Sequence, residues 1–90
     1  MPSYLVESYI AGTPRAVADA RRRARHAEEL GPGIRYLRTT FLPGDEVVLH
    51  LFEAPSLEAL DEAGRRAALP FERIVEAVDR PAEPQEEEER

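Results

Sequence analysis

Three side chains that could bind a metal ion or transfer a proton occupy strand-like positions far apart in the sequence: Glu7, His50 and Glu76. One imidazole with two carboxylates is a ligand set acceptable to nickel, zinc, copper or manganese. The same groups could transfer protons, because enclosure moves the pKa of a histidine or a carboxylate toward neutrality. A plainer interpretation makes His50 a hydrogen-bonded interface histidine and pairs the glutamates with Arg38 or Arg73. This plainer arrangement is the more common one in proteins, and the sequence alone leaves both interpretations open.

Other chemistries are limited by composition. The chain has no cysteine, so thiolate catalysis, disulfides, iron–sulfur clusters and cysteine zinc sites are excluded, and any metal must be held by nitrogen and oxygen. No glycine-rich phosphate loop, GxSxG or HExxH motif occurs. The arginines of residues 21–25 could touch phosphates, but acidic neighbours flank them, which favours a solvated helix face.

The formal net charge of -6 is concentrated at the carboxyl end of the 90-residue chain. Residues 82–90 carry five glutamates and one arginine, so the rest of the chain is only weakly acidic. We therefore expect no binding to nucleic acid or to an anionic membrane. No apolar run approaches the ~20 residues that cross a bilayer, and no secretory signal is visible, so a cytoplasmic location is expected.

The elements that must position the candidate side chains follow from hydrophobic periodicity and turn chemistry. Thr13 and Ser56 are expected to cap two helices, the first of which begins at Pro14. The turn formed by residues 43–45 joins two strand-like runs as a hairpin. Strands are expected at residues 4–10, 34–42, 46–53 and 71–78, and helices at 14–30 and from 57 to just before Pro70.

This order of elements predicts an α+β, ferredoxin-like βαββαβ fold, with a four-stranded antiparallel sheet and two helices on one face. The domain is expected to span residues 1–79. Residues 80–90 are expected to form a disordered acidic tail, because the segment has no apolar side chain large enough to offset the entropy of ordering.

Strand alternation predicts which side chains lie on the helix-free face. It places Glu7, His50 and Glu76 there, among Leu5, Tyr9, Val48, Phe52, Ile74 and Val78, with Tyr36 and Arg38 reaching in from the edge strand. A face this apolar predicts a homodimer in which two sheets face each other as a dimeric α+β barrel. The candidate ligand-binding residues of the enclosed pocket are Glu7, Tyr36, Arg38, His50, Phe52 and Glu76, of which His50, Glu7 and Glu76 are the candidate metal ligands.

Several stretches resemble a family of small ferredoxin-like proteins of largely unknown function (DUF4242-like) that is common in actinobacteria. They are residues 4–7, 36–38 with 40–41, 51–56 and 69–78. The family includes a nickel-binding member, so the resemblance implies the same fold and makes nickel, or another divalent metal, the leading cofactor. Members often have cysteine in the third strand, where this chain has Val48 and His50, so a thiolate-dependent role does not transfer.

Together these observations predict a non-catalytic homodimer that binds a nickel-like divalent ion or a small ligand between its sheets. One alternative is a small dimeric α+β barrel enzyme, resembling monooxygenases or isomerases that work without a bound metal. Another is a protein-interaction module that uses the open face or the acidic tail.

Overall fold

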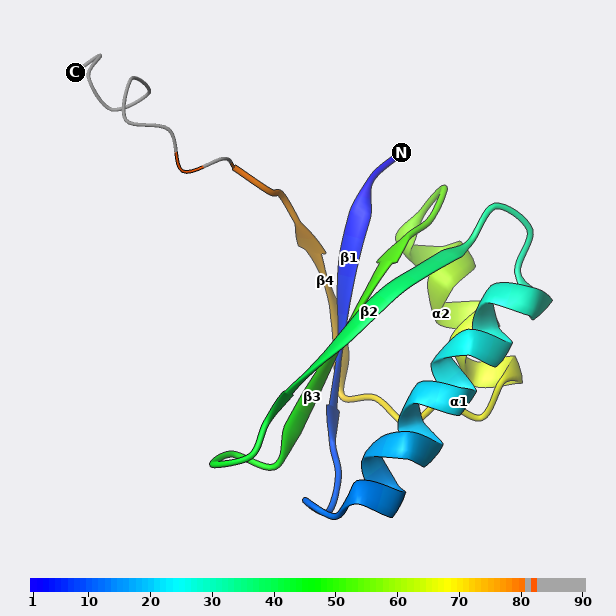
Figure 1. The fold of residues 1–90 in the computed structure, drawn as a ribbon. Helices are drawn as coiled ribbons and strands as arrows, with labels where there is room; N and C mark the ends of the chain where they lie inside the picture. Colours follow the sequence, from blue (N-terminus) through cyan, green and yellow to red (C-terminus); the bar gives the residue numbers. More distant parts are fainter. Residues whose placement is uncertain (81, 83–90) are drawn as a thin grey trace.

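The computed structural model describes residues 1–80 and 82. Its elements follow the expected order, as Figure 1 shows. They are β1 (Ser3–Tyr9), α1 (Pro14–Leu30), β2 (Arg35–Leu42), β3 (Val47–Glu53), α2 (Leu57–Arg66) and β4 (Arg73–Ala77). The helices and strands of the sequence prediction are therefore confirmed, with shifts of one to a few residues at several ends.

The helix starts are fixed by side-chain caps. The Thr13 hydroxyl accepts a hydrogen bond from the Ala16 amide at 3.1 Å, and Pro14 occupies the first helical position. The Ser56 hydroxyl accepts one from the Ala59 amide at 3.1 Å. Each cap satisfies a backbone N–H that has no partner inside its helix, which stabilises the helix by about 1 kcal/mol.

The sheet has the strand order β2-β3-β1-β4, and every neighbouring pair is antiparallel. The two central strands are thus β1 and β3, as predicted. Both helices lie on the same side of the sheet in Figure 1, and the other side has no covering element within the described residues. The chain therefore has the α+β, ferredoxin-like architecture.

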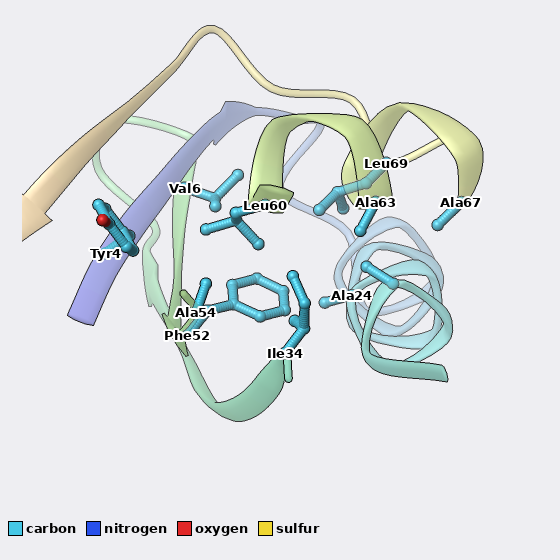
Figure 2. Close-up of a cluster of buried hydrophobic side chains, with 11 residues drawn as sticks. Tyr4, Val6, Ala24, Ile34, Phe52, Ala54, Leu60, Ala63, Ala67 and Leu69 are labelled. Atoms are coloured by element: carbon cyan, nitrogen blue, oxygen red, sulfur yellow. The ribbon is translucent and has the colours of Figure 1, made fainter. Parts of the chain in front are cut away.

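The core lies between the sheet and the helices, and its buried aromatic side chains, Tyr4 and Phe52, come from the sheet. The helices contribute small residues, among them Ala24, Ala27 and Ala63, which lets their backbones come close to the strands. Figure 2 shows the Phe52 ring pointing from β3 into this space beside Leu60. Full burial of a side chain such as Phe52 stabilises the fold by roughly 1.5–3 kcal/mol.

The predicted facing of β3 is wrong. Directly paired residues on antiparallel strands point to the same side of a sheet, and β3 pairs its His50 with Val6 and its Phe52 with Tyr4. Val6 and Tyr4 are core residues. His50 and Phe52 therefore face the helices, and both are fully buried.

The error has a physical origin in the composition of β3, which is apolar on both sides. Val47 and Leu51 on the open side are as strongly buried as core residues, at 5% exposure each. Alternation of polar and apolar residues therefore could not distinguish the faces. Because His50 is polar, the sequence favoured placing it on the open face. The small residues of the helices instead require bulky side chains on the helix side of the sheet.

The predicted facing of β4 is wrong for the same reason. Ile74 lies opposite Val6, and Glu76 lies opposite Tyr4, so both point to the helix side. Val75, opposite Leu5, lies on the open face instead. Val78, also expected on the open face, follows the end of β4 and is 69% exposed.

The edge strand β2 places its two candidate residues, Tyr36 and Arg38, on opposite sides of the sheet. A bulge lies between Tyr36 and Arg38, and it shifts the register of β2 against β3 by one residue. Tyr36 pairs with Phe52 and lies on the helix side, whereas Arg38 pairs with Leu51 and lies on the open side.

The predicted acidic tail, residues 80–90, falls largely outside the described residues. Within residues 1–80 and 82, neither helix is long and apolar enough to span a bilayer.

Candidate functional site

The helix-free face of the sheet is hollowed. A concavity of about 580 Å³ lies over its strands, and five aliphatic side chains line it: Leu5, Leu42, Val47, Leu49 and Val75. The strand register explains this composition, because Leu5 and Val75 are directly paired. The volume falls within the roughly 300–1,000 Å³ range of small-molecule sites. We call this surface the open face.

Four polar side chains complete the lining of the open face: Glu7, Tyr9, Asp45 and Arg73. Glu7 sits at the centre, opposite Leu49 on one side and Arg73 on the other. The Arg73 Nε atom donates to the Glu7 carboxylate at 2.6 Å, and this hydrogen bond raises the pKa of Arg73. The Tyr9 hydroxyl donates to the other Glu7 oxygen at 3.4 Å. Glu7 is therefore held in place by neighbours that are themselves exposed.

His50 lies on the other side of the sheet, in a separate environment. Its Nδ1 atom forms a 2.8 Å hydrogen bond with the Thr39 hydroxyl, which in turn bonds the hydroxyl of Tyr36. The Tyr36 ring meets the His50 ring edge-on, with centroids 6.3 Å apart. Within the described part of the chain, the buried Nε2 atom of His50 has no hydrogen-bond partner.

Burial controls the charge of His50. Removing the ring from water disfavours its charged form, so the pKa falls from 6.5 to about 4. No carboxylate forms an ion pair with His50 within residues 1–80 and 82 to offset this. At neutral pH the ring is therefore uncharged. His50 is a buried core histidine and cannot donate or accept a proton on the open face.

The three predicted metal ligands do not form one site in this chain. Glu7 projects to the open face, whereas His50 and Glu76 belong to the helix side. Among residues 1–80 and 82, no group of three or more metal-ligating side chains converges. The set of Glu7, His50 and Glu76 therefore does not fit a shared metal ion, and the prediction that these groups share one face is wrong.

The remaining predicted ligand-binding residues divide between the two faces. Arg38 is placed toward the open side by its pairing, whereas Phe52 and Tyr36 pack together on the helix side, with ring centroids 5.4 Å apart. The second histidine, His26, is exposed on α1, where its Nδ1 atom lies 3.2 Å from the Glu29 carboxylate. Of the six candidates, only Glu7 lines the concavity of the open face, whereas Arg38 lies at the edge strand, in a hollow that it shares with residues of α1.

Sequence reasoning assigned several residues of the open face to the helix side or left them out. Val47 and Leu49 are absent from the predicted helix-free face, and Asp45 was considered only as part of a turn, yet all three line the concavity. The alanine-rich stripe of α1 was the available signal. Such a stripe calls for the largest side chains of the sheet on the helix side, which assigns Phe52 inward and Leu49 outward.

The fold and the open face define the class: a ferredoxin-like α+β protein with one covered and one exposed sheet face. A family model described as "Nickel responsive protein SCO4226-like" matches residues 4–77. Because the match extends over most of the chain, the chain belongs to this family. The resemblance to a family with a nickel-related member is confirmed at this level, and the DUF4242 designation stays a prediction.

A solved structure supports the fold. The crystal structure of SCO4226 from Streptomyces coelicolor A3(2) superimposes with a TM-score of 0.73 at 18% sequence identity, covering 88% of this chain and 99% of that one. At this identity the likeness concerns the fold alone. No curated protein sequence matches the chain.

Proposed function

We propose that this protein is a non-catalytic homodimer that encloses a small ligand between two facing sheets. The observation that carries the proposal is the apolar concavity of about 580 Å³ on a sheet face left bare by the helices. An apolar surface of this kind is stabilised when a partner removes it from water. A second copy covers both surfaces at once.

The charges of the open face suit pairing with a copy of itself. Glu7 and Arg73 lie side by side near its centre, so a two-fold axis through this region brings the acid of one copy toward the base of the other. Leu5, Leu49 and Val75 supply an aliphatic surface around them. Such an interface is isologous, with the same patch on both subunits.

An uncharged apolar fluorophore, N-phenyl-1-naphthylamine, tests the cavity directly. We expect its emission to rise and saturate with the wild-type protein, because the dye leaves water for an aliphatic pocket. Leu49→Asp places a carboxylate at the centre of that pocket and should weaken dye binding by at least about tenfold, given the cost of desolvating a charge.

Leu57→Asp is the matched control. Leu57 is an exposed leucine at the first position of α2, where an acidic residue is tolerated by the helix dipole. Circular dichroism of both variants verifies that they are folded. Dye binding that is absent in the wild type, or equally reduced in both folded variants, contradicts the proposed cavity.

A divalent ion is the second candidate ligand, supported by the family's description as nickel responsive. On the open face, Glu7 and Asp45 are the carboxylates available, and two copies would contribute four. Carboxylate oxygens alone suit manganese or magnesium better than nickel, which favours imidazole or thiolate ligands.

Calorimetric titration with nickel chloride and with manganese chloride distinguishes these ions. If the ion lies on the open face, Glu7→Gln abolishes the heat of binding, whereas His50→Leu leaves it unchanged. Heat that depends on His50, or no heat with either salt, contradicts an open-face metal site and leaves the apolar ligand as the proposed occupant.

A further inference from the structure

A second concavity, of about 380 Å³, lies between α1 and the edge strand β2 and shares no lining residue with the open face. Three arginines line it: Arg21 and Arg25 from α1 and Arg38 from β2. No acidic side chain is among its lining residues. Three positive charges therefore converge at one hollow of the chain. We call it the α1–β2 pocket.

Among the described residues, only some of the arginines in the basic run of α1, residues 21–25, form ion pairs. Asp19 accepts from Arg22 at 2.6 Å and from Arg23 at 2.9 Å, which neutralises part of the run and lowers the pKa of Asp19. Arg21 and Arg25 form no ion pair within residues 1–80 and 82.

The acidic residue nearest in sequence to Arg25 has another role. Glu28, one turn further along α1, accepts a hydrogen bond from the Tyr36 backbone amide at 3.2 Å. Arg38, like Arg25, has no ion-pair partner in the described part of the chain. The three guanidinium groups of the pocket are therefore available to an external anion.

The rest of the α1–β2 pocket is suited to an apolar body. Val17, Leu37 and Phe41 contribute aliphatic and aromatic surface to it. The Arg25 guanidinium lies over the Tyr36 ring, 5.8 Å from its centroid, so its position is supported by a cation–π contact. The pocket could therefore bind a ligand that has both a charged group and an apolar part.

The inner wall of the pocket is held by partly buried hydrogen bonds. Tyr36 and Thr39 line the pocket, their hydroxyls bond each other, and Thr39 is bonded to the buried His50 ring. Because His50 is completely enclosed, this chain fixes the two hydroxyls relative to the core. A site built on fixed groups loses less entropy when a ligand binds.

We propose that the α1–β2 pocket binds a small organic monocarboxylate with an aromatic or aliphatic body. The guanidinium groups bind the carboxylate, since their planar N–H donors match its two oxygens. The apolar side chains cover the body of the acid. This site is separate from the ligand cavity of the proposed function and does not depend on it.

The test is a titration of the full-length, ¹⁵N-labelled protein with sodium benzoate, followed by two-dimensional NMR. Saturable shifts are expected at the amides of Leu37, Arg38 and Thr39, and not at Leu49 or Val75 of the open face. Sodium phosphate, which has the charge but no apolar body, should shift the same amides only weakly. Arg25→Gln and Arg38→Gln should each weaken benzoate binding by about tenfold or more.

Arg22→Gln is the matched control, because it removes a charge of the same helix that is already paired with Asp19. It should change the affinity by less than about twofold, as expected for an exposed pair. The proposal is overturned by no saturation with benzoate, by equal saturation with phosphate, or by an equal loss in Arg22→Gln, which would indicate a general charge effect. Shifts confined to the open face would overturn this site while supporting the proposed one.

Discussion

Among the single residues that the structure describes, His50 is the ionisable group that is fully buried in the core. Its ring is completely enclosed, bonded through Nδ1 to Thr39 and otherwise surrounded by the core. An uncharged imidazole suits this environment, whereas an imidazolium would be a buried charge without a counter-ion. The residue therefore links the stability of the fold to pH.

The direction of this linkage follows from the two pKa values of His50. The unfolded chain binds a proton with a pKa of 6.5, whereas in the folded chain the pKa of His50 is about 4. Between these values the unfolded state holds more protons, so the free energy of unfolding falls as the pH falls from 6.5 toward 4 and is fully restored above 6.5. The loss attributable to His50 should reach about 3 kcal/mol, measured by urea denaturation across this range.

His50→Leu should remove that part of the pH dependence while keeping the fold, because leucine fills the core and leaves no unpaired ring nitrogen. His26→Gln, a change at the exposed histidine of α1, should retain the wild-type pH profile. Parallel profiles for wild type and His50→Leu would contradict the assignment of His50 as a buried neutral ring.

At the scale of elements, the two helices meet closely at the end of α1. A side chain at Gly31 would place its Cβ atom 2.7 Å from Ile34 Cγ1 and 2.9 Å from the Ala63 Cβ atom of α2. Both distances are shorter than any ordinary carbon contact. Glycine is therefore needed here for the close approach of α1, α2 and the start of β2.

Gly31→Ala should lower the free energy of unfolding by about 1–3 kcal/mol, the usual cost of overpacking. Gly44→Ala is the matched control, since a Cβ atom at Gly44 in the hairpin turn meets nothing within 4 Å. Thermal or urea unfolding of both variants checks the difference. Equal stabilities would show that the junction relaxes without cost and would contradict its close packing.

Element positions were predictable because they depend on local signals. Thr13 and Pro14 begin α1, Ser56 precedes α2, and the turn at residues 43–45 joins β2 to β3 in the structure as in the sequence interpretation. These signals act over a few residues and need no knowledge of the tertiary fold. The facing of β3 has no such signal, because it depends on the register with β1 and on the size of the helix residues.

The candidate site was therefore predicted only in part. Glu7 was placed on the correct face because β1 alternates clearly, with Tyr4 and Val6 buried on the other side. His50 was misplaced because a polar residue in an apolar strand was assigned to the exposed side. The bulge beside Arg38 is also invisible in the sequence, and it divides Tyr36 from Arg38.

Across the whole molecule, the two sides of the sheet differ in how they are covered. The helix side is filled by a core that includes Phe52 and His50, whereas the open face keeps an apolar concavity around Glu7 and Arg73. The proposed homodimer is the simplest arrangement that covers this concavity while leaving the α1–β2 pocket accessible.

The solution mass of the full-length protein tests this account most directly. Sedimentation equilibrium should give twice the 10.1 kDa mass of one chain for the wild type and for Leu57→Asp. Leu49→Asp, changed on the open face, should sediment as a single folded chain. A wild-type protein that stays at the mass of one chain across the concentration range, or a folded Leu49→Asp that remains a dimer, would contradict pairing through the open face.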